Sequence, residues 1–166
     1  MLYILTGLPG SGKSTWAKEN LPNAVVVCKD TIREEICGDV NDQSKNKEVF
    51  NIARTRTKKL LEEGKDVITD ATHLTRKQRA NVAALAPAET AVGIVWMNTS
   101  LKTCLERNAA RDRVVPPNVI RKMHFTFERP KLEDCDTLII VQEQNTVNFH
   151  GKRRNSGKSM ARPFPA

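Results

Sequence analysis

Residues 7–15 read Gly7-Leu8-Pro9-Gly10-Ser11-Gly12-Lys13-Ser14-Thr15 and match the pattern GxxxxGK[ST]. An apolar run, Leu2–Leu5, precedes them as a short buried strand, and residues 14–19 after them open a helix. In this context glycines let successive backbone N–H groups converge on a polyphosphate at the N-terminus of a helix. We therefore predict that this phosphate loop binds a nucleoside triphosphate through Gly10, Ser11, Gly12, Lys13, Ser14 and Thr15.

Two side chains of the phosphate loop carry specific chemistry. The Lys13 ammonium is expected to bridge the outer phosphates, and the Ser14 hydroxyl to ligate Mg²⁺. The expected ligand is ATP or GTP with Mg²⁺. The alternative, a glycine-rich turn that binds nothing, does not require a strand before it and a helix after it.

The length of 166 residues suits one domain with a single core. We expect a cytoplasmic protein without membrane contact, because the first strand begins at residue 2 and no apolar run approaches the about 20 residues of a membrane span. The four cysteines form no CxxC pair, and we expect reduced thiols without a function.

The formal charge of +8 is unevenly distributed. Residues 150–166 hold five basic side chains and no acidic one, so residues 1–149 are close to balanced. We expect residues 1–149 to form the domain and residues 150–166 to be a disordered tail, since the tail is rich in Gly, Ser and Pro. The tail either contacts nucleic-acid phosphates or only aids solubility.

Strands and helices alternate along the rest of the chain, which favours an α/β fold of three layers, with a parallel sheet of about five strands flanked by helices. After the strand at residues 2–5, further strands are predicted at residues 24–28, 67–70, 91–97 and 137–141. Helices are predicted from Asp30 to about residue 37, through residues 49–61 to a stop at Gly64, and over residues 75–86, 100–112 and 116–127.

Ligands of such sheets bind beyond the carboxyl ends of the strands, so polar residues at these ends are candidates for the site. Asp30 follows the second strand and either accepts a proton from an attacking hydroxyl or caps the next helix. Arg33 lies on the same helical face and either binds an anionic group of the acceptor or is solvated. Asp70 ends the third strand, where it orders the Mg²⁺ shell, binds the acceptor, or only caps a turn.

Two arginines, Arg107 and Arg111, are spaced i and i+4 near the end of the helix at residues 100–112. Leu101, Cys104 and Leu105 mark the buried side of that helix, so the arginines share another face. We expect them to cover the transferring phosphoryl group, whose charge spreads over three oxygens in the transition state. The alternative is a solvated basic face.

Taken together, these segments resemble the kinase domain of phage polynucleotide 5′-hydroxyl kinases and their close P-loop kinase relatives, over residues 1–141. The resemblance rests on residues 7–15, Lys29-Asp30-Thr31-Ile32-Arg33, Asp70-Ala71-Thr72, Arg107-Asn108-Ala109-Ala110-Arg111, Val115-Pro116 and Val119-Ile120-Arg121-Lys122-Met123.

The resemblance implies roles for particular residues. Lys13 and Ser14 become the phosphate and metal residues, and Asp30 the general base on the 5′-hydroxyl. Arg33 becomes the clamp on the 3′-phosphate of the acceptor, and Arg111 the transition-state arginine. We further expect Arg107 to belong to the nucleotide site, and Asp70 and Thr72 to the acceptor site.

The sequence departs from the family pattern in two ways. Lys29 stands where an arginine is usual, and no phosphatase region with a DxD motif follows the kinase segment. We therefore predict an ATP- and Mg²⁺-dependent kinase that acts on 5′-hydroxyl ends of nucleic acid. Two alternatives remain: a kinase for a sugar, an antibiotic or a nucleotide-sugar precursor, and a nucleotide-gated protein that binds nucleic acid through its basic tail.

Overall fold

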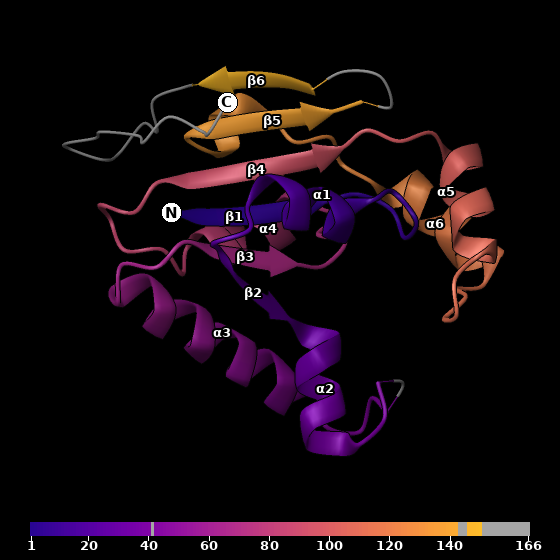
Figure 1. Cartoon of the computed structure of the whole chain (residues 1–166), viewed down its shortest axis with the longest axis horizontal. Coiled ribbons are helices and arrows are strands. Elements are labelled where there is room, and N and C mark those ends of the chain that lie inside the picture. The colour runs from indigo at the N-terminus through magenta and orange to yellow at the C-terminus, as the bar shows by residue number, and fades with distance from the viewer. Residues whose placement is uncertain (41, 143–145, 151–166) are drawn as a thin grey trace.

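The computed structural model describes residues 1–40, 42–142 and 146–150. Its centre is one six-stranded sheet in the order β2-β3-β1-β4-β5-β6 (Figure 1). Strands β1 to β5 run parallel, whereas β6 pairs antiparallel with β5. The strands are β1 (Leu2–Thr6), β2 (Val25–Cys28), β3 (Val67–Asp70), β4 (Val92–Met97), β5 (Thr137–Val141) and β6 (Thr146–His150). The predicted α/β fold with a largely parallel sheet between helices is confirmed.

Six α-helices and a short 3₁₀ turn at Leu132–Asp134 connect the strands within the described residues. The caps follow local chemistry, because Thr75 and Gln78 form a capping box and the Ser100 hydroxyl accepts from the Thr103 amide. The helices are α1 (Lys13–Asn20), α2 (Lys29–Cys37), α3 (Asn46–Glu62), α4 (Arg76–Ala83), α5 (Leu101–Ala109) and α6 (Pro117–Thr126).

Both faces of the inner strands β3, β1 and β4 are buried, which explains why these strands are apolar without a polar alternation, whereas Val25 and Val26 of the edge strand β2 are exposed. In β1, Leu2 and Ile4 pack on one face together with α3 and α4, while Tyr3 and Leu5 pack on the other face with α1. All four side chains are at most 5 % exposed. The core therefore holds the carboxyl edge of the sheet rigidly between two helical layers.

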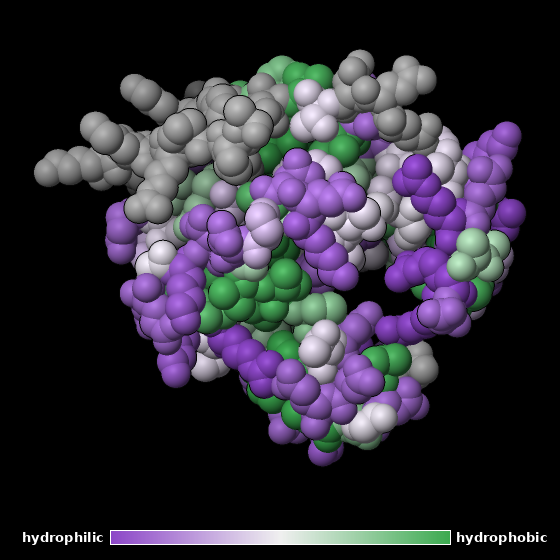
Figure 2. Space-filling model, viewed as in Figure 1, coloured by the Kyte–Doolittle hydropathy of each residue, from purple (hydrophilic) through white to green (hydrophobic). Residues whose placement is uncertain are grey.

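That edge collects the polar residues of the site. Thr6 leads into the phosphate loop, and the register places Cys28 of β2 opposite Asp70 of β3. Helices α5 and α6 lie beyond the same edge, and α2 lies below it (Figure 1). Figure 2 shows a hollow between the α2 region and the α5–α6 region, with hydrophilic side chains along its rim.

The structure corrects three expectations. Strand β6 adds a sixth, antiparallel strand, and His150, which we assigned to the tail, ends it. Cys28, not Asp30, is the N-cap residue of α2, and no side chain caps that helix. Helix α5 ends at Ala109, so Arg111 lies in the following loop and does not share a helical face with Arg107.

The rest of the predicted tail, residues 151–166, lies outside the described residues. Within the residues that are described, no helix has the length and apolar character that crossing a membrane requires.

Candidate phosphoryl-transfer site

The phosphate loop depends on glycine at two of its turns. Gly10 and Gly12 have φ angles of +79° and +92°, in the left-handed region that other residues rarely adopt. A Cβ atom on Gly10 would lie 2.4 Å from the carbonyl oxygen of Cys104 in α5. The loop therefore packs directly on the α5 backbone, and α1 begins behind it without a side-chain cap. An uncapped helix N-terminus of this kind suits a phosphate.

Lys13 is buried inside the phosphate loop. Its Nζ atom donates to the carbonyl oxygens of Gly7 at 3.0 Å and Leu8 at 2.8 Å. Burial, the largest effect, lowers the pKa of Lys13 to about 8, and the nearby Asp70 opposes this shift. The hydrogen-bond partners of the ammonium, two carbonyls and the Ser11 hydroxyl at 3.4 Å, are all neutral, so an anion that enters the loop gains a strong partner.

Ser14 and Asp70 provide the oxygens of a candidate Mg²⁺ site. The Ser14 hydroxyl donates to Asp70 Oδ2 at 2.8 Å, which leaves the lone pairs of Ser14 for a cation. The described residues contain no cluster of three or more His, Cys, Asp or Glu side chains that could hold a metal ion. Two protein oxygens beside a phosphate cradle fit Mg²⁺, which usually takes its other ligands from water and substrate phosphates.

Asp30 lies between two arginines. Its Oδ1 atom accepts from Arg33 at 2.8 Å, one turn further along α2, and its Oδ2 atom accepts from Arg113 at 3.0 Å. Arg113 lies after α5 and Asp30 lies in α2, so this ion pair joins the α2 region to the segment that follows α5. Asp30 and Arg113 are half-exposed, and such pairs contribute about 0 to 1 kcal/mol, so an acceptor can replace Arg113 at low cost.

Arg33 is not a solvated side chain, because it is only 9 % exposed. Besides Asp30, its guanidinium donates to Asn46 Oδ1 at 3.0 Å, while its Nε atom finds no partner among the described residues. Arg33 therefore positions the Asp30 carboxylate and ties α2 to the start of α3. The sequence placed Arg33 near Asp30 correctly but gave no signal for the bond to Asn46.

Arg107 and Arg111 both approach the phosphate loop, although they lie in different elements. If Gly12 carried a Cβ atom, that atom would lie 3.7 Å from Nη1 of Arg107, so the Arg107 guanidinium lies beside Gly12. Arg111 lies close enough to Lys13 that its charge contributes to lowering the pKa of Lys13. The packing of α5 on the loop at Gly10 thus places the Arg107 guanidinium beside Gly12, and Arg111 follows in the segment after that helix.

The loop after β3 is fixed by backbone contacts. Thr72 accepts from the Gly7 amide at 3.1 Å, which joins this loop to the phosphate loop. His73 adopts a φ of 40° and places Nδ1 2.7 Å from the Leu5 carbonyl oxygen. A carbonyl only accepts, so Nδ1 carries the proton, and burial lowers the pKa of His73 to about 4. Arg79, which is fully buried, donates to the carbonyl oxygens of His73 and Glu128.

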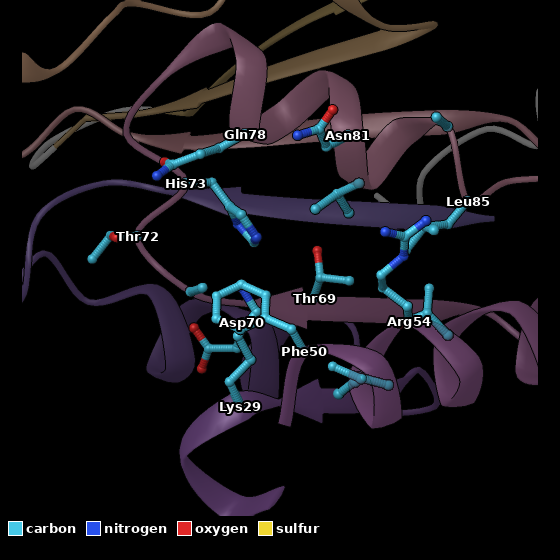
Figure 3. Close-up of a pocket in the computed structure, with 16 residues that line it drawn as sticks. Lys29, Phe50, Arg54, Thr69, Asp70, Thr72, His73, Gln78, Asn81 and Leu85 are labelled. Atoms are coloured by element: carbon cyan, nitrogen blue, oxygen red, sulfur yellow. The ribbon is translucent and has the colours of Figure 1, made fainter. Parts of the chain in front are cut away.

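A cavity of about 540 Å³ opens between α3 and α4 beside Asp70 (Figure 3). The Lys29 ammonium lies 3.9 Å above the Phe50 ring at one side of it. Arg54 of α3 and Asn81 of α4 also line the cavity. Phe50, Arg54 and Asn81 were not identified from the sequence, because nothing in their spacing separates them from ordinary residues on two helices.

Comparisons with known proteins bear on this site. A protein-family model described as an AAA domain matches residues 2–130. A curated relative from Methanococcus maripaludis, named L-seryl-tRNA(Sec) kinase, is 30 % identical over 139 residues. The alignment covers 78 % of this chain and 53 % of the relative, so the chain spans about half the length of that protein.

Solved structures share the fold. A chain of the Pnkp1/Rnl/Hen1 RNA repair complex aligns with a TM-score of 0.67 and 21 % identity, over 75 % of this chain and 43 % of that chain. A sugar kinase from Janibacter sp. HTCC2649 aligns with a TM-score of 0.63 and 16 % identity, over 87 % and 86 % of the two chains. At these identities the likeness shows the fold alone.

Proposed function

We propose that this chain, which belongs to the family whose model is described as an AAA domain, is a P-loop kinase that transfers the γ-phosphoryl group of ATP to the 5′-hydroxyl end of a nucleic acid. The observation that carries this proposal is the position of Asp30. Asp30 lies two residues after Cys28, which pairs with Asp70, and Asp70 accepts from Ser14 of the phosphate loop, so a carboxylate held by Arg33 and Arg113 lies at the same carboxyl edge of the sheet as that loop.

The residues divide the reaction between them. Asp30 accepts the proton of the acceptor hydroxyl. As it does so, the oxygen of that hydroxyl forms a bond to the γ-phosphorus, and the bond between the γ-phosphorus and the departing ADP oxygen breaks. Lys13 leaves the Gly7 and Leu8 carbonyls and binds the phosphates, whose charge it stabilises. Arg107 and Arg111 neutralise the charge that develops on the transferring group.

Mg²⁺ would be held by the Ser14 hydroxyl, with Asp70 orienting that hydroxyl from behind. A bound cation would supply positive charge that screens the charge of the phosphates. Arg33 orients Asp30, and a direct contact with a 3′-phosphate of the acceptor requires Arg33 to release Asn46. Thr72 lies on the acceptor side, where it lines the cavity beside Asp70.

The relatives support an acceptor that is part of a nucleic acid. The curated relative is named for a tRNA substrate, and the structure with a TM-score of 0.67 belongs to an RNA repair complex. The near-balanced charge of residues 1–149 indicates that only the end of such a molecule is bound tightly, not a long stretch of its backbone.

A second candidate is a kinase for a small hydroxylated molecule. The cavity of about 540 Å³ beside Asp70 is large enough for a whole small acceptor. The chain also covers 86 % of the Janibacter sugar kinase, against 43 % of the RNA repair protein. The ATP site would be the same in both cases, so only the acceptor distinguishes them.

Transfer of label from γ-labelled ATP tests the choice. The acceptors are an oligonucleotide with a 5′-hydroxyl, the same oligonucleotide with a 5′-phosphate, a set of sugars, and no acceptor. We expect label only on the 5′-hydroxyl oligonucleotide, and none with the Lys13→Ala variant. Label on a sugar alone would favour the second candidate, and release of free phosphate without transfer would contradict both.

A further inference from the structure

The cavity between α3 and α4 is lined by more cationic than anionic side chains. Lys29 and Arg54 line it as cations, and Asp70 is the one carboxylate among the lining residues. Asp70 accepts from Ser14 and its charge faces the phosphate loop. The end of the cavity at Arg54, where Arg54 and Asn81 are both exposed, therefore carries positive charge without a counter-charge from the described lining residues.

Arg54 is the cation of this cavity whose charge has no partner among the described residues. It makes no hydrogen bond or ion pair with any residue that the structure describes, whereas Arg56, two positions on in α3, binds Glu35 at 2.6 Å. Figure 3 shows the Arg54 guanidinium reaching toward Leu85 and the side of α4 that carries Asn81. An arginine that extends into a cavity without a partner is available for an anion.

The two ends of the cavity are chemically different. Lys29 and Phe50 lie near Asp70, at the end that faces the phosphate loop (Figure 3). Arg54 follows Phe50 by one helical turn, about 6 Å further along α3. Between them the walls are largely apolar, with Val27, Ala53 and Val82. Such a cavity fits a small molecule or terminal residue with a hydroxyl at one end and an anionic group at the other.

We propose that this cavity binds the acceptor and that Arg54 binds an oxyanion, a phosphate or a carboxylate, which the acceptor carries away from its reacting hydroxyl. This inference rests on the proposed function, since it concerns the acceptor of the same reaction. It assigns anion recognition to a residue other than Arg33, whose guanidinium already bonds to Asp30 and Asn46. A nucleoside 3′-phosphate and a sugar acid both present this chemistry.

Binding without turnover tests the assignment. Isothermal titration of the ATP-free protein would use a nucleoside 3′-monophosphate, the same nucleoside without phosphate, and a six-carbon sugar acid with its neutral parent sugar. The variants are Arg54→Gln, Arg54→Lys and, as a matched control on the same helix, Arg56→Gln. We expect the wild type to bind one anionic compound about tenfold more tightly than its neutral partner, and Arg54→Gln to remove that difference.

The other variants sharpen the outcome. Arg54→Lys is expected to restore part of the preference, and Arg56→Gln to leave it unchanged, with all three variants melting close to the wild type. The anionic compound that binds identifies the source of the oxyanion. The assignment is overturned if no anionic compound binds the wild type preferentially, or if Arg54→Gln keeps the preference. Because the titration needs no catalysis, a failure of phosphoryl transfer would contradict the proposed function and not this binding result.

Discussion

The contact between the phosphate loop and α5 can be tested with one added methyl group, in the variant Gly10→Ala. The new Cβ atom would lie 2.4 Å from the Cys104 carbonyl oxygen, although Cβ contacts under 3.0 Å essentially never occur. Overpacking of this kind costs about 1 to 3 kcal/mol. The φ of +79° adds about 1 kcal/mol for a residue other than glycine. We therefore expect the free energy of unfolding to fall by about 2 to 4 kcal/mol.

Gly38→Ala is the matched control, because Gly38 has a φ of +72° and nothing within 4 Å of its Cβ position. The free energy of unfolding of this variant should fall only by the cost of a positive φ for a residue other than glycine, about 1 kcal/mol. The melting temperature should therefore fall by about 5 to 15 °C for Gly10→Ala and by about 2 to 4 °C for Gly38→Ala. Nucleotide affinity should fall about tenfold or more only for Gly10→Ala, because the loop must shift. Equal melting and affinity in the two variants would refute the packing of the loop on α5.

Three further predictions concern ionisable groups. Nucleotide affinity should weaken as the pH rises above about 8, by up to about tenfold per pH unit, because Lys13 loses the proton with which it binds phosphates. Measurement of nucleotide affinity from about pH 7 to 10 checks this, and a Lys13→Met variant should show no such trend. Asp70→Asn should weaken the Mg²⁺-dependent part of nucleotide binding about ten- to a hundredfold and leave binding in EDTA unchanged, whereas equal losses in both conditions would argue against a metal role. The pKa of His73 is about 4 in the folded protein and 6.5 in the unfolded chain, so between these pH values only the unfolded chain binds the extra proton. The free energy of unfolding should therefore decrease by up to about 3 kcal/mol as the pH is lowered from about 6.5 to 4. Denaturation of His73→Asn, which tolerates the positive φ, should show a smaller loss over this range than the wild type.

The sequence predicted the parts of the fold that local patterns encode. The phosphate loop, the apolar inner strands and the helix starts at residues 75 and 100 each follow from residues within a few positions of one another. Strand β6 was missed because Val147 and Phe149 lie on an edge strand, 40 % and 44 % exposed, and five residues with weak alternation give little signal.

The site depends on contacts that no local pattern encodes. The Ser14–Asp70 bond joins residues 56 positions apart, and the Asp30–Arg113 pair joins residues 83 positions apart. The sequence identified Asp30 and Asp70 because they end parallel strands, which is a rule of topology. It placed Arg113 in the basic cluster of residues 107–113 without assigning it a partner, and it did not identify Arg54, because an arginine in a loop or on a helix resembles any solvated cation until the fold places it beside a partner or a cavity.

The rate of phosphoryl transfer by Asp30→Asn, measured with saturating ATP and the preferred acceptor, tests the central claim most directly. Asn keeps the size of the side chain and still bonds to an arginine, but it cannot accept the hydroxyl proton. The account predicts that transfer falls by about a hundredfold or more, while melting changes little, since the ion pairs of Asp30 are half-exposed. Transfer by Asp30→Asn at the rate of the wild type would contradict the account.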